Sequence, residues 1–500
     1  MNFELKKEHL HTTSADLVVV GCFQDTTPSM QAADGGKNLD KLFDAKLSEI
    51  LKHSAFGGKL LETQTIYTHK IIRAQNILVI GLGEKEKLCL ESLQLLAAQI
   101  QREALKLGAK TVALVLEEKK IKKFSAEARL SAMVQGFLLG SYSFNRYKTE
   151  QENKPQLTAI SFLCSSTKKS LHTAIDTARA IADGITLTRD LINIPSNDLT
   201  PTLLAKEAEK VAKRHKLFVD IWDEAKIKKE KMTAHLAVSQ ASAEKPTFIH
   251  LRYKAKNAKA SIALVGKGVT FDTGGISLKP PKGMWEMKGD MGGAGTVLGI
   301  MEAIAQTKPN VNVDAYIPSA ENMPGGKAFK PGDIIRARNQ KTIEILSTDA
   351  EGRLLLADAL DYASDFKHDY IIDFATLTGG APIALGELYA ALLVNDEQLG
   401  KKLLASAKAT EEYMWKLPLE QKYLKTIQTG PADLMNAGGS RAQTITAGLF
   451  LSQFVKDKKW AHLDIAACSD TDKDSLLCPK GGTGALVQSF VHFLHSFSGK

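Results

Sequence analysis

The chain of 500 residues is 44% hydrophobic and 24% charged, proportions that are ordinary for a globular protein of two domains. No apolar stretch is long enough to span a bilayer, so we expect no membrane partner. A formal charge of +9 is compatible with a surface that binds nucleic acid. However, the lysine-rich clusters at 117–123 and 225–232 are short and also contain acids. We interpret them as exposed faces, and we do not expect nucleic-acid binding to be the main function.

The N-terminal residues and the cysteines indicate the compartment. The first apolar run is too short and comes too late for a signal peptide. The five cysteines are scattered along the chain and form no CxxC pair. This pattern predicts a reducing, cytoplasmic location and no structural zinc.

Residues 1–167 are predicted to form a smaller N-terminal α/β domain. Four β-branched runs are expected to be buried strands, at 15–23, 75–83, 109–117 and 157–166. A helical stretch at 92–108 lies among them. Strands that alternate with helices favour a largely parallel sheet.

Residues 168–500 are predicted to form a larger α/β domain around a central, mostly parallel sheet. Its expected strands lie within 259–272, 310–326, 342–352 and 369–380, and a helix is expected at 293–307. Each strand leads into a loop of small or ionisable residues. Ligands of such sheets bind outside the carboxyl ends of the strands, so we expect these loops to meet there.

Several familiar sites are excluded by their motifs. The chain has no Gly-x-Ser-x-Gly elbow, no Gly-Lys followed by Ser or Thr, and no HExxH. "VIGLGEKEK" begins like a dinucleotide loop but lacks the third glycine. His492 and His495 have helical spacing and are expected to be surface or packing residues.

The loops of the second domain concentrate acids and bases. They contain four carboxylates together with lysines and one arginine: Lys267, Asp272, Lys279, Lys288, Asp290, Asp349, Glu351 and Arg353. Asp349 and Glu351 are two residues apart at an expected strand end, where they would face the same way and require a cation. His368 is the only histidine between residues 262 and 380. We therefore predict a dinuclear metal site with bridging carboxylates, and a helix-capping turn is the alternative for 347–360 alone.

These motifs also resemble a known family. "VGKGVTFDTGGISLKP", "MKGD", "IPSAENMPGGKAFKPGD", "STDAEGRLLLADAL" and "DFATLTGG" are similar to those of the leucyl aminopeptidases, the cytosolic M17 metallopeptidases. The resemblance runs from 188–201 to 481–494, whereas residues 1–165 match only in their α/β pattern. It implies a metal-dependent aminopeptidase that releases N-terminal residues, preferentially Leu, from peptides by attack of a water that bridges two metal ions.

The resemblance implies roles for individual residues. One metal ion, Mn²⁺ or Zn²⁺, would be held by Lys267, Asp272, Asp290 and Glu351, and the second by Asp272, Asp349 and Glu351. Lys279 and Arg353 match the catalytic pair, with a bicarbonate held by Arg353. A pocket for the first side chain is expected from Met287, Thr376, Leu377 and Gly379. The family also implies a homohexamer.

Other features leave room for alternatives. A dinuclear phosphoesterase would use the same metals but would not explain Lys267 among the ligands. A DNA-binding role of the basic N-terminal domain is compatible with peptidase activity. Ser347, Pro281 and Lys282 depart from the family pattern, as does 466–478, which follows "HLDIA" near the substrate pocket. Because the predicted pocket is apolar, we expect a peptide whose first residue is acidic or basic to be cut slowly.

Overall fold

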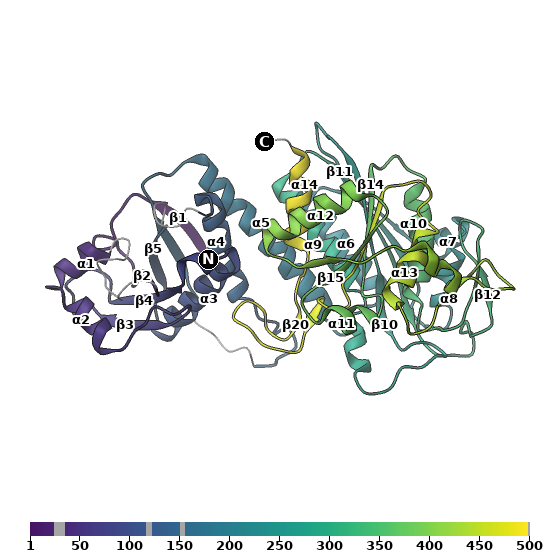
Figure 1. Ribbon diagram of the computed structural model, residues 1–500, viewed down its shortest axis with the longest axis horizontal. Helices are drawn as coiled ribbons and strands as arrows, with labels where there is room; N and C mark the ends of the chain where they lie inside the picture. The colour runs from purple at the N-terminus through teal and green to yellow at the C-terminus, as the bar shows by residue number, and fades with distance from the viewer. Residues whose placement is uncertain (25–35, 117–122, 151–155, 499–500) are drawn as a thin grey trace. The chain divides into compact units, whose positions relative to one another are not determined.

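The computed structural model describes residues 1–24, 36–116, 123–150 and 156–498 (Figure 1). The lysine cluster at 117–123 therefore lies almost entirely outside the described residues. The chain divides into two compact units, Met1–Ala182 with Asp474–Pro479 and Asp183–Lys473 with Lys480–Lys500. The predicted boundary at residue 167 stays a prediction. Over the part of the chain that is described, no helix has the length and apolar character needed to cross a membrane.

The first unit contains a six-stranded sheet of order β1-β6-β5-β2-β4-β3. Its strands are β1 (Asn2–Lys6), β2 (Leu17–Phe23), β3 (Thr63–Tyr67), β4 (Asn76–Gly83), β5 (Thr111–Val115) and β6 (Ala159–Leu163). All neighbours are parallel except β3, which runs antiparallel to β4. The four predicted strands are confirmed, and β1 and β3 are additional.

Both faces of this sheet are covered. Leu17 and Val19 belong to the core formed with α3 (Leu90–Lys106) and α4 (Ala126–Gly140). Val18 and Val20 belong to a second core, formed with α1 (Gly36–Leu42) and α2 (Lys46–His53). Strands buried on both faces are apolar at every position, which explains why β2 reads as a continuous apolar run.

The second unit contains a nine-stranded sheet of order β16-β15-β18-β14-β9-β11-β8-β7, with β10 paired to β11. Its strands are β7 (Phe218–Trp222), β8 (Thr247–Tyr253), β9 (Ser261–Gly266), β10 (Gly268–Asp272), β11 (Asn312–Asn322), β14 (Tyr370–Ala375), β15 (Ala390–Val394), β16 (Met414–Lys416) and β18 (Trp460–Asp464). The central strands β11, β9, β14 and β18 are parallel, and β7 and β8 pair antiparallel with their neighbours. Strand β15 pairs antiparallel with β18 and parallel with β16. The predicted α/β class, with two domains and a mostly parallel sheet, is confirmed.

Helices cover this second sheet. They are α6 (Pro201–His215), α7 (Glu224–Lys229), α8 (Thr233–Ser239), α9 (Gly292–Thr307), α10 (Gly352–Ser364), α11 (Gly380–Leu385), α12 (Glu397–Thr410), α13 (Gln443–Ser452) and α14 (Val487–His495); α5 (Lys169–Asn193) begins in the first unit and ends in the second. Helices α8, α10 and α13 share a core with Ala263, Val265 and Ile371 of the sheet. Helix α9 contacts β9 and β14 and packs against α14 (Figure 1).

Two strand predictions are wrong in detail. The predicted strand 259–272 is interrupted at Lys267, whose backbone N–H donates to Phe374 O and whose carbonyl accepts from Ala294 N–H. The predicted strand 342–352 shrinks to β13 (Thr342–Glu344), which lies in a separate small sheet with β12 (Ile334–Arg336) and β17 (Leu434–Met435). The acids of "STDAEGR" therefore follow a peripheral strand and not a central one.

Candidate active site

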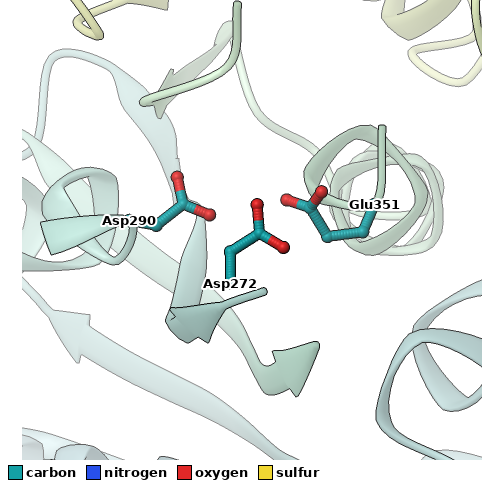
Figure 2. A group of neighbouring side chains, drawn as sticks. All are labelled: Asp272, Asp290 and Glu351. Carbon is teal, nitrogen blue, oxygen red and sulfur yellow. The ribbon is translucent and has the colours of Figure 1, made fainter. Parts of the chain in front are cut away.

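Three buried carboxylates converge at the carboxyl edge of the second sheet. Asp272 ends β10, Asp290 follows the 3₁₀ helix η2 (Met284–Gly289), and Glu351 immediately precedes α10. One oxygen from each lies within 4.8 Å of the others. Figure 2 shows the three carboxylates turned toward one another. Like charges held this close in a buried place need a cation among them.

Lys267 supplies one positive charge to this cluster. Its Nζ lies 2.7 Å from Asp290 Oδ1 and 3.0 Å from Glu351 Oε1. It also donates to Thr376 O at 2.8 Å. Burial lowers the pKa of Lys267, but the attraction of the surrounding carboxylates outweighs burial and raises that pKa overall.

Gly352 makes room for the lysine side chain. A Cβ built at this position would stand 2.3 Å from Lys267 Cε, far inside van der Waals contact. Any side chain at the first residue of α10 would therefore push the lysine out of the cluster. The glycine of "AEGR" is explained by this close approach.

The carboxylates hold more negative charge than the lysine can neutralise. Burial, reinforced by the charge of Asp272, raises the pKa of Glu351 to about 8. Burial also raises the pKa of Asp290 to about 6, although Lys267 opposes the shift. The buried atoms Asp290 Oδ2 and Glu351 Oε2 have no hydrogen-bond partner among the described residues. Carboxylate oxygens without donors are the ligands that divalent cations take, so this donor set fits a metal ion.

Asp349 is placed differently from the other three acids. The expectation that Asp349 and Glu351 point the same way from a strand is wrong, because Asp349 lies in a loop and Glu351 has helical backbone angles. Asp349 pairs with Lys279, whose Nζ also lies 2.9 Å from Asp272 Oδ2. Burial lowers the pKa of Lys279, yet Asp272, Glu351 and Asp349 raise it overall. The lysine is therefore held as a cation at the edge of the cluster.

Arg353 lies behind the cluster on the first turn of α10. It is buried, and its Nη1 donates to Asn436 O at 2.7 Å. Its Nε has no hydrogen-bond partner within the described part of the chain. Burial lowers the pKa of Arg353 to about 10, against the attraction of Glu351 and Asp464. A buried guanidinium with an unused donor is suited to hold an anion.

Two asparagines that the sequence did not single out fix the acidic loops. Asn322 Nδ2 donates to Asp272 Oδ1 at 2.7 Å and to Thr348 O at 3.0 Å. Asn436 Oδ1 accepts from Leu346 N at 2.8 Å, and its Nδ2 donates to Ser347 O at 2.6 Å. Asn322 lies within one of the quoted motifs, whereas nothing in the sequence marks Asn436, because its partners lie far away in sequence.

A cavity of about 500 Å³ opens above the carboxylates. All predicted pocket residues line it, together with all predicted metal ligands and Lys279: Met287, Thr376, Leu377, Gly379, Lys267, Asp272, Asp290, Asp349 and Glu351. Four further acids, which the sequence did not predict, also line it: Glu286, Glu387, Asp470 and Asp472. Asp470 and Asp472 belong to 466–478. The departure of that segment from the family pattern was the one feature of the sequence that indicated a difference near the pocket.

The carboxylate of Asp464 accepts hydrogen bonds from two of the segments that line the cavity. This buried carboxylate accepts from Leu377 N at 3.1 Å, from Thr378 Oγ1 at 2.6 Å and from Ala466 N at 3.2 Å. Thr378 Oγ1 lies 2.8 Å from Thr444 Oγ1 at the start of α13. One side chain at the end of β18 thus positions two walls of the cavity.

Comparisons with known proteins agree with this architecture. Residues 186–491 match the catalytic domain of the cytosol aminopeptidase family, and residues 19–151 match the N-terminal domain of that family. The chain is 39% identical to a probable cytosol aminopeptidase of Alkaliphilus metalliredigens (strain QYMF), with 99% of both chains covered. It is also 39% identical to that of Geotalea uraniireducens (strain Rf4), with 96% of both covered.

Solved structures are similar over nearly the whole chain. A mutant of tomato leucine aminopeptidase superposes with a TM-score of 0.89 at 32% identity, covering 99% of this chain and 96% of that one. The bottromycin maturation enzyme BotP in complex with Mn superposes with a TM-score of 0.86 at 30% identity, covering 97% of this chain and 100% of that one.

Proposed function

Because the chain belongs to the cytosol aminopeptidase (M17) family and is a metal-dependent aminopeptidase, a hydrolase, we propose that it releases Leu and other apolar residues from the N-terminus of peptides. The observation that carries the proposal is the buried carboxylate cluster with Lys267 on the floor of a cavity. Met287 and Leu377 give this cavity an apolar, adaptable surface that suits Leu or Met.

Two divalent ions, Mn²⁺ or Zn²⁺, fit the donor set. Lys267, Asp272, Asp290 and Glu351 would hold one ion, and Asp272, Asp349 and Glu351 the other. The unpartnered oxygens of Asp290 and Glu351 support this assignment. When bound, the ions would supply Lewis acidity and lower the pKa of a water molecule. Lys267 would act as a neutral amine, having lost its proton to solvent.

Lys279 and Arg353 act beside these donors. Lys279 keeps its proton and is positioned to donate to the carbonyl oxygen of the substrate as negative charge develops there. Arg353 would hold a bicarbonate through its unused Nε–H. Both ring nitrogens of His368 are hydrogen-bonded to Ser261 and Tyr316, so this histidine is not free to act as the base. A carboxylate or the bicarbonate would therefore accept the proton that the reaction releases.

The assay compares three compounds with Mn²⁺, Zn²⁺ or Mg²⁺ present. Leucinamide should be hydrolysed, because its free α-amine can take a place among the acidic groups of the cavity. N-acetyl-leucinamide should not be, because acetylation removes that amine. An aryl phosphate ester tests the phosphoesterase alternative. Comparable rates on the acetylated amide, or turnover of the phosphate ester alone, would overturn the proposal.

Assembly and location complete the proposal. We expect a homohexamer whose active sites face an interior cavity, so that peptides enter and folded proteins do not. Light scattering of the active enzyme should then give about six times the 54.4 kDa of one chain, and a fully active monomer would contradict it. We also propose a cytoplasmic location. DNA binding by the N-terminal domain is the alternative additional role, which we do not expect, and filter binding across a salt series tests it.

A further inference from the structure

The two ends of the family resemblance, 188–201 and 481–494, contain none of the predicted site residues. In the structure, residues of both stretches meet at the C-terminal end of α5, within the second unit. Arg189 of this helix is buried, and its Nε donates to Thr483 O at 2.9 Å. Asn193, the last residue of the helix, contacts the same segment. The metal donors therefore do not explain these two stretches.

Close packing of glycines accompanies these hydrogen bonds. Asn193 Oδ1 accepts from Gly482 N at 2.9 Å. A Cβ at Gly481 would stand 2.1 Å from the same oxygen, and a Cβ at Gly482 would stand 2.9 Å from Ile192 Cβ. Both positions therefore require glycine, because any side chain would push this segment away from the end of α5.

The segment held by α5 in turn holds one wall of the catalytic cavity. Thr483 Oγ1 donates to Cys468 O at 2.6 Å, and Thr483 N–H donates to Ser469 O at 2.9 Å. The short strand β20 (Gly481–Gly482) pairs antiparallel with β19 (Asp470–Thr471). Ser469 and both residues of β19 line the cavity. The position of this wall therefore depends on the end of α5.

Lys288 ties a second wall of the cavity to the same helix end. It lies on η2 directly after Met287, which lines the cavity. Its Nζ donates to Asn193 O at 2.9 Å. This carbonyl is at the C-terminal end of α5, where a positive charge interacts favourably with the helix dipole. Both walls are thus attached to one residue of α5.

Asp290, two residues after Lys288, is held in a different way. Thr376 Oγ1 donates to Asp290 Oδ1 at 2.7 Å, and Lys267 Nζ lies 2.7 Å from the same oxygen. The position of this metal donor therefore does not depend on Lys288. Loss of the hydrogen bond from Lys288 would release the Met287 side of η2 while Asp290 stays in place.

We propose that Lys288 is a positioning residue, which holds the η2 wall of the cavity against the end of α5 and so sets the affinity for substrate without touching it. Substrate binds between the two walls, so a displaced wall weakens binding, whereas the metal donors and Lys279 keep their places. The kinetic part of the test rests on the aminopeptidase function proposed above, and the structural part does not.

The kinetic test compares Lys288→Met with Lys288→Arg in the metal-loaded enzyme. Methionine removes the charged donor, so KM for leucinamide should rise about tenfold, the factor that corresponds to one charge-assisted hydrogen bond. The kcat and the Mn²⁺ content should stay close to the wild-type values, whereas a general loss of structure would lower both. Lys288→Arg keeps a donor and should restore most of the affinity.

Amide hydrogen exchange tests the wall directly and needs no activity. In Lys288→Met, exchange should be faster in peptides that cover 284–290 and unchanged in peptides that cover α10. Lys210→Met is the matched control, because it removes an exposed lysine of α6 that pairs with Glu207 at 2.7 Å. This control should leave both KM and the exchange at 284–290 unchanged.

Each of four results would overturn the inference. They are an unchanged KM in Lys288→Met, unchanged exchange at 284–290, a Lys288→Arg enzyme as impaired as Lys288→Met, and loss of a metal ion from Lys288→Met. The last would place Lys288 in the metal site. Absence of leucinamide hydrolysis by the wild-type enzyme would instead defeat the proposed function, and the exchange measurement would still decide the role of Lys288.

Discussion

Replacing Lys267 by methionine tests whether the buried amine binds a metal ion or competes with it. In the structure its Nζ contacts Asp290 and Glu351 at 2.7 and 3.0 Å. If the amine is a ligand, Lys267→Met removes a donor and one ion should be lost. If the ammonium only neutralises the two carboxylates, its removal frees them and the ions should bind more tightly. The two hypotheses predict effects of opposite sign.

The magnitude follows from the proton that the lysine must lose. Deprotonating an ordinary lysine at pH 7 costs about 5 kcal/mol, at about 1.36 kcal/mol per pKa unit. The surrounding carboxylates raise the pKa of Lys267, so the cost in the metal-free protein is larger. Metal affinity at the site of the ion that Lys267 binds should therefore increase at least about tenfold for each pH unit near pH 7, because Lys267 releases one proton as that ion binds and Glu351 releases the proton that it holds in the metal-free enzyme.

The variant should also weaken the metal-free fold. Removing one partner from a buried ion pair costs about 3–5 kcal/mol. Asp290 can avoid part of this cost by taking up a proton, since burial already raises its pKa to about 6. We expect a lower melting temperature of the metal-free variant and incomplete recovery when Mn²⁺ is added.

The assay is the number of ions bound per subunit after dialysis against Mn²⁺ at fixed free concentration, measured near pH 7 and again near pH 8. Wild-type enzyme should retain two ions and Lys267→Met one. Lys279→Met is the matched control, because it removes the other lysine of the cavity, which pairs with Asp272 and Asp349. The reasoning is refuted if Lys267→Met retains both ions with unchanged or higher affinity.

Three further changes probe neighbouring groups. Lys279→Ala should lower kcat strongly at unchanged metal content, and normal turnover would remove its role in the transition state. Asp464→Asn should cost about 1–3 kcal/mol of stability and raise KM, because the buried hydroxyl of Thr378 loses its acceptor; an unchanged melting curve would show that the loops do not depend on it. In metal-free enzyme, the pKa of Glu351 lies near 8, above its unfolded value, so the native state holds a proton that the unfolded chain has released. Stability should consequently fall by about 2 kcal/mol between pH 6.5 and 8. Glu351→Gln should lack this decline, and an equal decline in both proteins would disprove the assignment.

Much of the fold was predictable because its signals are local. Strands β2 and β4 are continuous apolar runs, since both faces of their sheet are buried. Strand β3, with the sequence TQTIY, has no such signal, because an edge strand is only partly covered. The break at Lys267 was not predictable either, since it depends on hydrogen bonds with Phe374 and Ala294, which are remote in sequence.

The candidate site divides in the same way. The residues predicted to bind metal belong to short motifs, and their residue types and spacing were enough to predict a metal site. Asn436 and Asp464 were missed because their importance comes from which backbone groups they meet, and these groups are set by the tertiary fold. Glu286 and Asp470 were missed because they lie on η2 and on the short strand β19 (Asp470–Thr471), separate segments that only the folded chain brings to one cavity.

The convergence of Asp272, Asp290 and Glu351 from three separate segments has a consequence for the stability of the second unit. An ion held by all three binds the folded second unit and not its unfolded chain, so it stabilises that unit in proportion to the concentration of free metal. The first unit contributes no residue to this group of three, so any effect of the ion on the first unit has to pass through the second. Metal supply would then set the resistance of the second unit to heat and to proteases.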